Sequence, residues 1–181
     1  MGHAARAEAV EDPTAAAPCE AVRVRRERVR LVVVCGLPGA GKTTLATRLA
    51  TELDAVRMTP DDWLAHLQLD IWDGELRGRI ERLQWSVAKQ LLESRRSVVV
   101  DFGSWSRAER DELRSAARGL GVDVELHFLD APIDVLFERT KARGREAAWG
   151  RAITRAEMEE WSALIERPTE EELALFDNQG P

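Results

Sequence analysis

The chain has 181 residues, of which 44% are hydrophobic and 32% charged, and a formal net charge of −6. This length suits one well-buried domain and excludes a large multidomain machine. Its apolar runs are far shorter than the roughly 20 residues of a membrane span, and its acidic balance argues against non-specific binding to nucleic acid. The two cysteines, Cys19 and Cys35, do not form a disulfide framework. No apolar secretory leader is found, so we expect a cytoplasmic protein.

The predicted secondary structure begins after an N-terminal tail. Residues 1–28 offer almost no large apolar side chain to bury, so we expect a disordered tail there and one domain over residues 29–181. A β-branched run over residues 29–35 is typical of a strand buried on both faces. From Gly41, leucines at four-residue spacing predict an amphipathic helix. Residues 55–59 then predict a weak strand, and Pro60 begins a short helix.

The rest of the chain alternates helices with strands. Helices are predicted over residues 75–96, 107–119, 132–143 and 154–165, and strands over residues 97–101 and 122–129. This alternation favours an α/β fold, with a parallel sheet of four or five strands and helices on both faces. With four strands, one sheet edge needs cover from the final helix or from a second subunit.

Residues 36–43, with the sequence GLPGAGKT, fit the phosphate-binding pattern GxxxxGK[ST] between a strand and a helix. Glycines let backbone amides turn inward around phosphate oxygens, and the start of the helix adds positive potential. Lys42 then reaches the β- and γ-phosphates, and Thr43 offers its hydroxyl to Mg²⁺. The predicted nucleotide-binding residues of this loop are Gly36, Gly39, Ala40, Gly41, Lys42, Thr43 and Thr44.

This motif and the elements around it resemble those of P-loop kinases, in the group of zeta-toxin-like, chloramphenicol-phosphotransferase-like and polynucleotide-kinase-like enzymes. The resemblance spans residues 29–177 and implies a three-layer nucleotide-kinase fold that uses ATP, or GTP, with Mg²⁺. In these kinases an Asp after the second strand is the catalytic base, followed by an acidic and an aromatic residue. Asp61, Asp62 and Trp63 match that form, so the resemblance assigns the base to Asp61. The alternative is that both carboxylates cap the helix at Pro60, with Asp62 the stronger candidate for the cap.

The resemblance also suggests residues for the metal and for a lid. Asp101 ends a predicted strand, where this fold places an Asp that holds the Mg²⁺ hydration shell or the substrate. Residues 138–145 resemble the lid helix of nucleotide kinases, in which a first Arg stacks on adenine and a second contacts the phosphates. Arg139 and Arg143 occupy these positions, in a lid of about residues 138–153 that would exclude water. The alternative for Asp101 is a carboxylate that only caps the next turn. The alternative for Arg139 and Arg143 is a solvated arginine-rich surface helix.

The residues that bind the phosphoryl acceptor are less clearly marked. Polynucleotide-kinase-like enzymes carry an Arg three residues after the base to grip the acceptor's phosphate, but this chain has Leu64 there, which favours a less charged acceptor. Indoles suit sugars, nucleosides or aromatic antibiotics, although Trp63, Trp72 and Trp105 could also pack the core. Arg107 either binds an anion or begins its helix. The candidate acceptor residues are therefore Asp62, Trp63, Trp105 and Arg107, while Trp85, Trp149 and Trp161 are expected to pack.

The leading functional hypothesis is an ATP- and Mg²⁺-dependent kinase that phosphorylates a hydroxyl of a small molecule, such as a nucleoside, a sugar or an antibiotic-like compound. We expect the small-molecule acceptor as its partner, no membrane, and a monomer or homodimer. The predicted catalytic residues are Lys42, Asp61 and Arg143, and the predicted metal-binding residues are Thr43 and Asp101.

Two other functions remain open. A kinase of polynucleotide 5′ ends or of nucleotides would need a basic groove, which Arg77, Arg79 and Arg82 of the long helix could supply. A nucleotide-binding regulatory module would need no acceptor chemistry, and therefore neither a base at Asp61 nor a lid with two arginines.

Overall fold

The structure, a computed structural model, describes residues 28–144 and 151–178. Its strands form one parallel sheet in the order β2-β3-β1-β4. The predicted α/β fold is thereby confirmed, with four strands in the described part of the chain. The strands are β1 (Arg30–Gly36), β2 (Val56–Met58), β3 (Val98–Gly103) and β4 (Asp123–Leu129).

The helices α1 to α6 agree with the predicted ones apart from small shifts at their ends, whereas the short α7 was not predicted. Side chains cap four of the helices: Asp73 accepts from two amides at the start of α3, Ser106 and Thr154 form capping boxes on α4 and α6, and the Thr169 hydroxyl accepts from the Glu172 amide on α7. Within the described ranges, no helix combines the length and apolar composition of a membrane span. The helices are α1 (Lys42–Glu52), α2 (Pro60–His66), α3 (Gly74–Glu93), α4 (Arg107–Gly119), α5 (Ile133–Gly144), α6 (Arg155–Leu164) and α7 (Glu170–Leu173).

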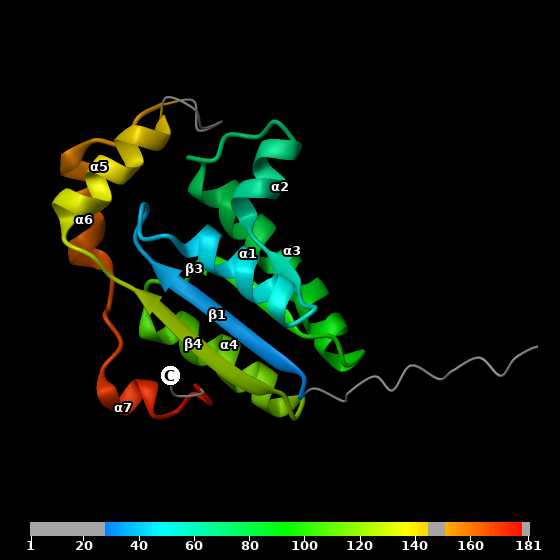
Figure 1. The fold of residues 1–181 in the computed structure, drawn as a ribbon. Helices are drawn as coiled ribbons and strands as arrows, with labels where there is room; N and C mark the ends of the chain where they lie inside the picture. The colour runs from blue at the N-terminus through cyan, green and yellow to red at the C-terminus, as the bar shows by residue number, and fades with distance from the viewer. Residues whose placement is uncertain (1–27, 145–150, 179–181) are drawn as a thin grey trace, which may run out of the picture.

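The sheet is covered on both faces because its central strands are apolar on both sides. Val32 and Val34 of β1 pack with Ala46 of α1, whereas the alternate residues Leu31 and Val33 belong to a cluster shared with α3 and α4. A third cluster lies beyond the carboxyl ends of the strands, where Figure 1 shows α5 and α6. The phosphate-binding loop of residues 36–43, called the P-loop below, therefore lies where the sheet, the helices on its two faces and the α5–α6 pair meet.

The free edge of β4 is covered by the last described residues. The Asp177 amide donates to the carbonyl of Val124 at 2.7 Å, and the Asp177 carboxylate accepts from the Val124 amide at 2.8 Å. The side-chain amide of Asn178 likewise accepts from the Leu126 amide at 2.8 Å and donates to its carbonyl at 3.0 Å. These groups satisfy backbone positions that a fifth strand would pair. A short segment after α7 thus provides the cover that the sequence predicted from the final helix or a second subunit.

Cys35 is fully buried near the end of β1. Burial raises the pKa of its thiol to about 12, against the weaker opposing charges of Arg110 and Lys42. Because the thiolate is the reactive form, we expect a Cys19→Ser variant, whose remaining thiol is Cys35, to react with Ellman's reagent at pH 8 only after denaturation. The folded pKa lies above the unfolded value of about 8.5, so this thiol should lower stability as pH rises from there toward 12. Rapid labelling of the native variant would contradict this expectation.

Candidate active site

The P-loop connects β1 to α1 through three glycines with positive φ angles. These angles are 137° at Gly36, 81° at Gly39 and 97° at Gly41, a region that other residues rarely adopt. A Cβ at Gly36 would collide with the carbonyl oxygen of Leu129, and one at Gly39 would lie 2.6 Å from the carbonyl oxygen of Leu136. Glycine is therefore required both by the turn and by the close approach of β4 and α5.

Lys42 and Thr43 begin α1 and lie close to Asp101 of β3. Thr43 Oγ1 donates to Asp101 Oδ2 at 3.1 Å, and Lys42 Nζ donates to the carbonyl of Leu37 at 3.2 Å. Burial raises the pKa of Asp101, against the charge of Lys42 and the hydrogen bond from Thr43. Burial lowers the pKa of Lys42, against the charges of Asp101 and Asp61. Each charged group thus helps the other to stay ionised.

The donors beside the P-loop fit a magnesium ion. Asp101 Oδ1 is buried and has no hydrogen-bond partner in the described part of the chain, and the Thr43 hydroxyl lies beside this carboxylate. Among the described residues, no group of three or more His, Cys, Asp or Glu side chains is placed to hold a metal. Mg²⁺ does not need such a group, because it commonly takes one or two protein oxygens and completes its shell with water and phosphate.

Asp61 and Asp62 lie in the first turn of α2 but have different surroundings. Asp61 Oδ1 accepts from Arg77 Nη1 at 2.5 Å. Asp62 instead pairs with Arg57 of β2. The N-cap of α2 is Thr59, and no side chain hydrogen-bonds there, so the prediction that Asp62 caps this helix is wrong. Asp61 lines the cavity beside the P-loop, so it remains the candidate base.

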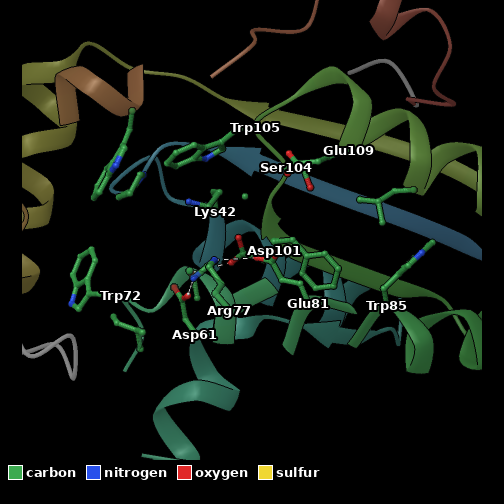
Figure 2. Close-up of a pocket in the computed structure, with 18 of the residues that line it drawn as sticks. Lys42, Asp61, Trp72, Arg77, Glu81, Trp85, Asp101, Ser104, Trp105 and Glu109 are labelled. Carbon is green, nitrogen blue, oxygen red and sulfur yellow. Dashed lines mark hydrogen bonds and ion pairs between the residues drawn. The ribbon is translucent and has the colours of Figure 1, made fainter. Parts of the chain in front are cut away.

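A cavity of about 590 Å³ opens beside the P-loop, a size suited to a small-molecule ligand. Figure 2 shows Lys42, Asp61 and Asp101 converging on it, with Arg77 beside Asp61. Its other walls come from the loop before α3, from α3 itself, from the end of β3, from α4 and from residues after the lid region. The cavity thus joins the phosphate-binding end to a larger space where an acceptor can lie.

The structure brings part of the predicted lid to the P-loop. Arg139 of α5 donates through Nη1 to the carbonyl of Gly39 at 3.4 Å. Ala40 packs against the cluster that α5 and α6 share, and Thr44 is exposed on α1. The side chain of Arg143 and residues 145–150 lie outside the described residues, so the phosphate contact and the closure of the lid stay predictions.

The predicted acceptor residues separate into two groups. Trp105 lines the cavity, whereas Asp62, Trp63 and Arg107 are not among its described lining residues. Trp63 packs against the core cluster shared with α3 and α4, and the Arg107 amide donates to a Glu166 carboxylate oxygen at 2.6 Å. We therefore leave Asp62, Trp63 and Arg107 out of the site.

Other cavity residues were not predicted from the sequence. Trp85 and Trp161 pack against core clusters, as expected for both, but they also line the cavity. Arg77, Glu81 and Trp85 share one face of α3, because four-residue spacing returns to the same side of a helix. That spacing was a signal that could have placed Trp85 on the same cavity wall as Arg77. Trp161 reaches the site from α6, and its sequence position gives no comparable signal.

Comparison with known proteins supports the kinase assignment of this fold. The L-seryl-tRNA(Sec) kinase of Methanococcus maripaludis is 24% identical over 121 residues, which are 64% of this chain and 47% of that protein. The chain thus spans about half the length of this curated relative. The Pnkp1/Rnl/Hen1 RNA repair complex matches with a TM-score of 0.66 and 23% identity, over 76% of this chain and 44% of that chain. A gluconokinase from Sinorhizobium meliloti 1021 matches with a TM-score of 0.55 and 22% identity, over 80% of each chain.

These solved structures share the fold, and the resemblance to P-loop kinases is confirmed. The family model AAA_33, described as an AAA domain, matches residues 31–168, which is most of the chain. The P-loop and the sheet order described above lie within that match. The chain therefore belongs to the AAA_33 family of AAA domains and has a kinase-like P-loop fold.

Proposed function

We propose that this protein transfers the γ-phosphoryl group of ATP to a hydroxyl group of a small molecule, in a reaction that requires Mg²⁺. The observation that carries the proposal is that Lys42, Asp61 and the P-loop face one cavity. The P-loop supplies amides and an ammonium for the triphosphate. Asp61 supplies the carboxylate that a kinase needs to accept the proton of the attacking hydroxyl. A module that only senses nucleotides needs no such carboxylate.

The residues around Asp61 give it a defined orientation. Arg77 holds Oδ1 of Asp61 at 2.5 Å, and Glu81 in turn holds Arg77 at 3.0 Å. Within the described ranges, Oδ2 of Asp61 takes part in no hydrogen bond, so it can accept the proton of the acceptor hydroxyl. Thr43 and Asp101 would hold Mg²⁺, which neutralises phosphate charge when bound. Lys42 would stabilise the charge on the transferring group.

A second candidate function is phosphorylation of an RNA-linked hydroxyl. The name of the curated relative, L-seryl-tRNA(Sec) kinase, and the RNA repair complex favour it. Arg82 lines the cavity and Arg79 is exposed on the same helix, as a basic groove would require. However, Arg77 is already paired with two carboxylates, and the whole chain is acidic. A small-molecule acceptor therefore agrees better with the charges of the site.

Incubation with radiolabelled ATP, Mg²⁺ and separate panels of nucleosides, sugars, aromatic alcohols and 5′-hydroxyl oligoribonucleotides tests both candidates. Labelled product from the small molecules, lost on addition of EDTA, is the expected result. Label that enters oligoribonucleotides alone would favour the second candidate. Tight ATP binding with no phosphorylated acceptor in any panel would overturn the proposal.

Lys42→Met should reduce the rate of phosphoryl transfer by about 10²-fold, because it removes a donor aimed at the charge that develops in transfer. Lys89→Met on α3 is the matched control, since Lys89 is exposed and lies outside the cavity lining. Initial rates at saturating ATP and acceptor should fall in the first variant alone. Equal rates in the two variants would remove Lys42 from the mechanism.

A further inference from the structure

Three tryptophans from distant parts of the sequence form one wall of the cavity. Trp72 precedes α3, Trp105 follows β3 and Trp161 lies on α6. The ring centroids of Trp161 and Trp72 are 6.3 Å apart, with 19° between the ring planes. The ring centroids of Trp161 and Trp105 are 6.0 Å apart, with 45° between the planes. All three are half-buried, so part of each indole faces the cavity. We call these three residues the tryptophan wall.

The backbone beside Trp105 is held in a strained conformation. Gly103 and Ser104 have φ angles of 98° and 44°, and serine rarely adopts the second. Strain of this kind persists only where surrounding contacts enforce it, and it is common at binding sites. Ser104 and Trp105 both line the cavity, so the strained turn is part of its wall.

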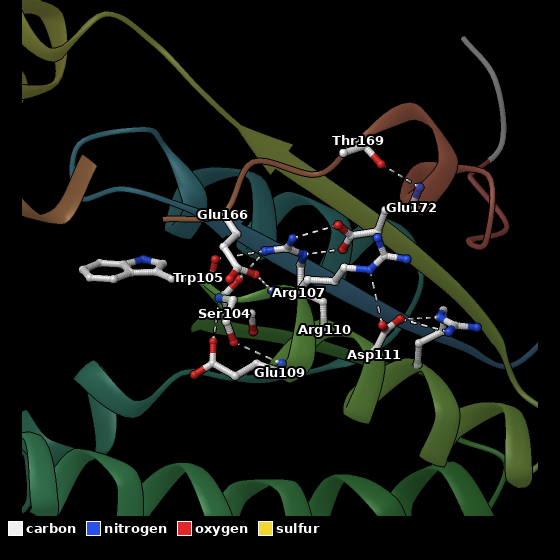
Figure 3. A network of polar contacts seen from close by, with 11 residues as sticks. Ser104, Trp105, Arg107, Glu109, Arg110, Asp111, Glu166, Thr169 and Glu172 are labelled. Atoms are coloured by element: carbon white, nitrogen blue, oxygen red, sulfur yellow. Dashed lines mark hydrogen bonds and ion pairs between the residues drawn. The ribbon is translucent and has the colours of Figure 1, made fainter. Parts of the chain in front are cut away.

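A buried ion pair enforces this turn. Arg110 Nη1 donates to the carbonyl oxygens of Ser104 at 3.2 Å and Trp105 at 3.1 Å. The same guanidinium binds both carboxylate oxygens of Glu172 on α7, at 2.6 and 2.9 Å. Figure 3 shows this network, in which the amide of Glu166 also donates to the Trp105 carbonyl at 2.9 Å. The backbone at Trp105 is therefore fixed before a ligand arrives, which reduces the entropy cost of binding one.

The charges along the cavity disfavour a phosphorylated acceptor. Arg77 is neutralised by Asp61 and Glu81. On the α4 side, Glu109 and Glu112 add two more carboxylates to the wall, against one further cation, Arg82, so carboxylates outnumber cations on this side of the cavity. A phosphate group bound there would be repelled by these carboxylates. A neutral acceptor meets no such penalty.

From the tryptophan wall and these charges, we infer that the acceptor is a neutral alcohol with a flat aromatic or heteroaromatic ring. Its ring stacks on Trp105 and Trp161, and its hydroxyl faces Asp61. Indole faces favour stacked or tilted rings, and the cavity combines these faces with polar groups, among them Asp61. This inference rests on the proposed function and specifies its substrate class.

The first test compares acceptors by kcat/KM. Adenosine, thymidine and 2-phenylethanol represent ring alcohols, ribose and glycerol lack an aromatic ring, and 3′-AMP keeps the free 5′-hydroxyl of adenosine but carries a phosphate. We expect at least one ring alcohol to exceed the ring-free alcohols, and adenosine to exceed 3′-AMP, by about tenfold or more. Transfer that prefers ring-free alcohols or 3′-AMP, and that still requires Asp61, would overturn this inference and leave the proposed function standing. Absence of transfer to any acceptor would overturn both.

The second test changes the wall. Trp105→Leu should raise KM for the preferred ring alcohol by about tenfold, with kcat and the KM for ATP nearly unchanged, because stacking binds the acceptor without taking part in the transfer. Trp105→Phe keeps an aromatic face and should restore most of the affinity for the ring alcohol. This variant replaces Trp105→Leu in the test if the Leu variant does not fold. Trp63→Leu makes the same change in an indole outside the cavity and should leave KM unchanged. A folded Trp105→Leu enzyme with unaltered KM for the ring alcohol would contradict the inference.

Discussion

Asp61→Asn should lower kcat by about 10²- to 10⁴-fold while the affinity for ATP changes little. Asparagine has nearly the same shape and can still contact Arg77, but its amide cannot accept the proton of the acceptor hydroxyl. The carboxylate lies 2.5 Å from Arg77, which holds it toward the cavity. The loss should therefore fall on the chemical step and leave the P-loop intact.

Single-turnover rates at saturating ATP and acceptor measure that step directly, and calorimetry with a non-hydrolysable ATP analogue measures nucleotide binding. Asp62→Asn is the matched control, because it makes the same change one residue further along, in a carboxylate that pairs with Arg57 away from the cavity. It should retain a rate close to that of the unmodified protein. If Asp61→Asn also retained its rate, Asp61 would not be the base.

The fold could be predicted because its signals are local. The β-branched run before the P-loop predicts a strand buried on both faces, and the glycines and Lys42 mark the turn that follows it. The capping residues Ser106 and Thr154 lie next to their helices in sequence. Periodicity and capping depend on near neighbours, so one sequence is sufficient to recognise them.

The acceptor side of the cavity could not be predicted in the same way, because its contacts join residues far apart in sequence. Trp161 reaches Trp105 from α6, and Arg110 meets Glu172 from α7. The partner of Asp61 was also missed, since Arg77 comes from the next helix. Periodicity shows which face of a helix is apolar, but tertiary packing decides which helix meets that face.

Glu172→Gln should lower the free energy of unfolding by about 3–5 kcal/mol, the largest effect on stability expected in this protein. The side chains of Arg110 and Glu172 are 0% and 2% exposed, so the substitution leaves a buried guanidinium without its counter-charge. Burial lowers the pKa of Arg110, but the hydrogen bonds and charge of Glu172 outweigh it and raise this pKa. Without Glu172 this pKa falls, but a guanidinium is not deprotonated in proteins, so Arg110 stays charged when its partner is lost. A loss of this size is a large share of the roughly 5–15 kcal/mol by which domains are usually stable.

Urea denaturation at neutral pH measures the effect, and Glu170→Gln is the control because Glu170 is exposed in the same helix and should change stability by less than about 1 kcal/mol. The double variant Arg110→Met/Glu172→Leu removes both charges and should recover part of the lost stability. Recovery should be incomplete, because the carbonyls of Ser104 and Trp105 lose their donor. Because that donor also holds the turn that carries Trp105, the double variant should have a higher KM for the acceptor than the unmodified protein, even after it regains stability. If Glu172→Gln were as stable as Glu170→Gln, the ion pair would not hold the turn that carries Trp105.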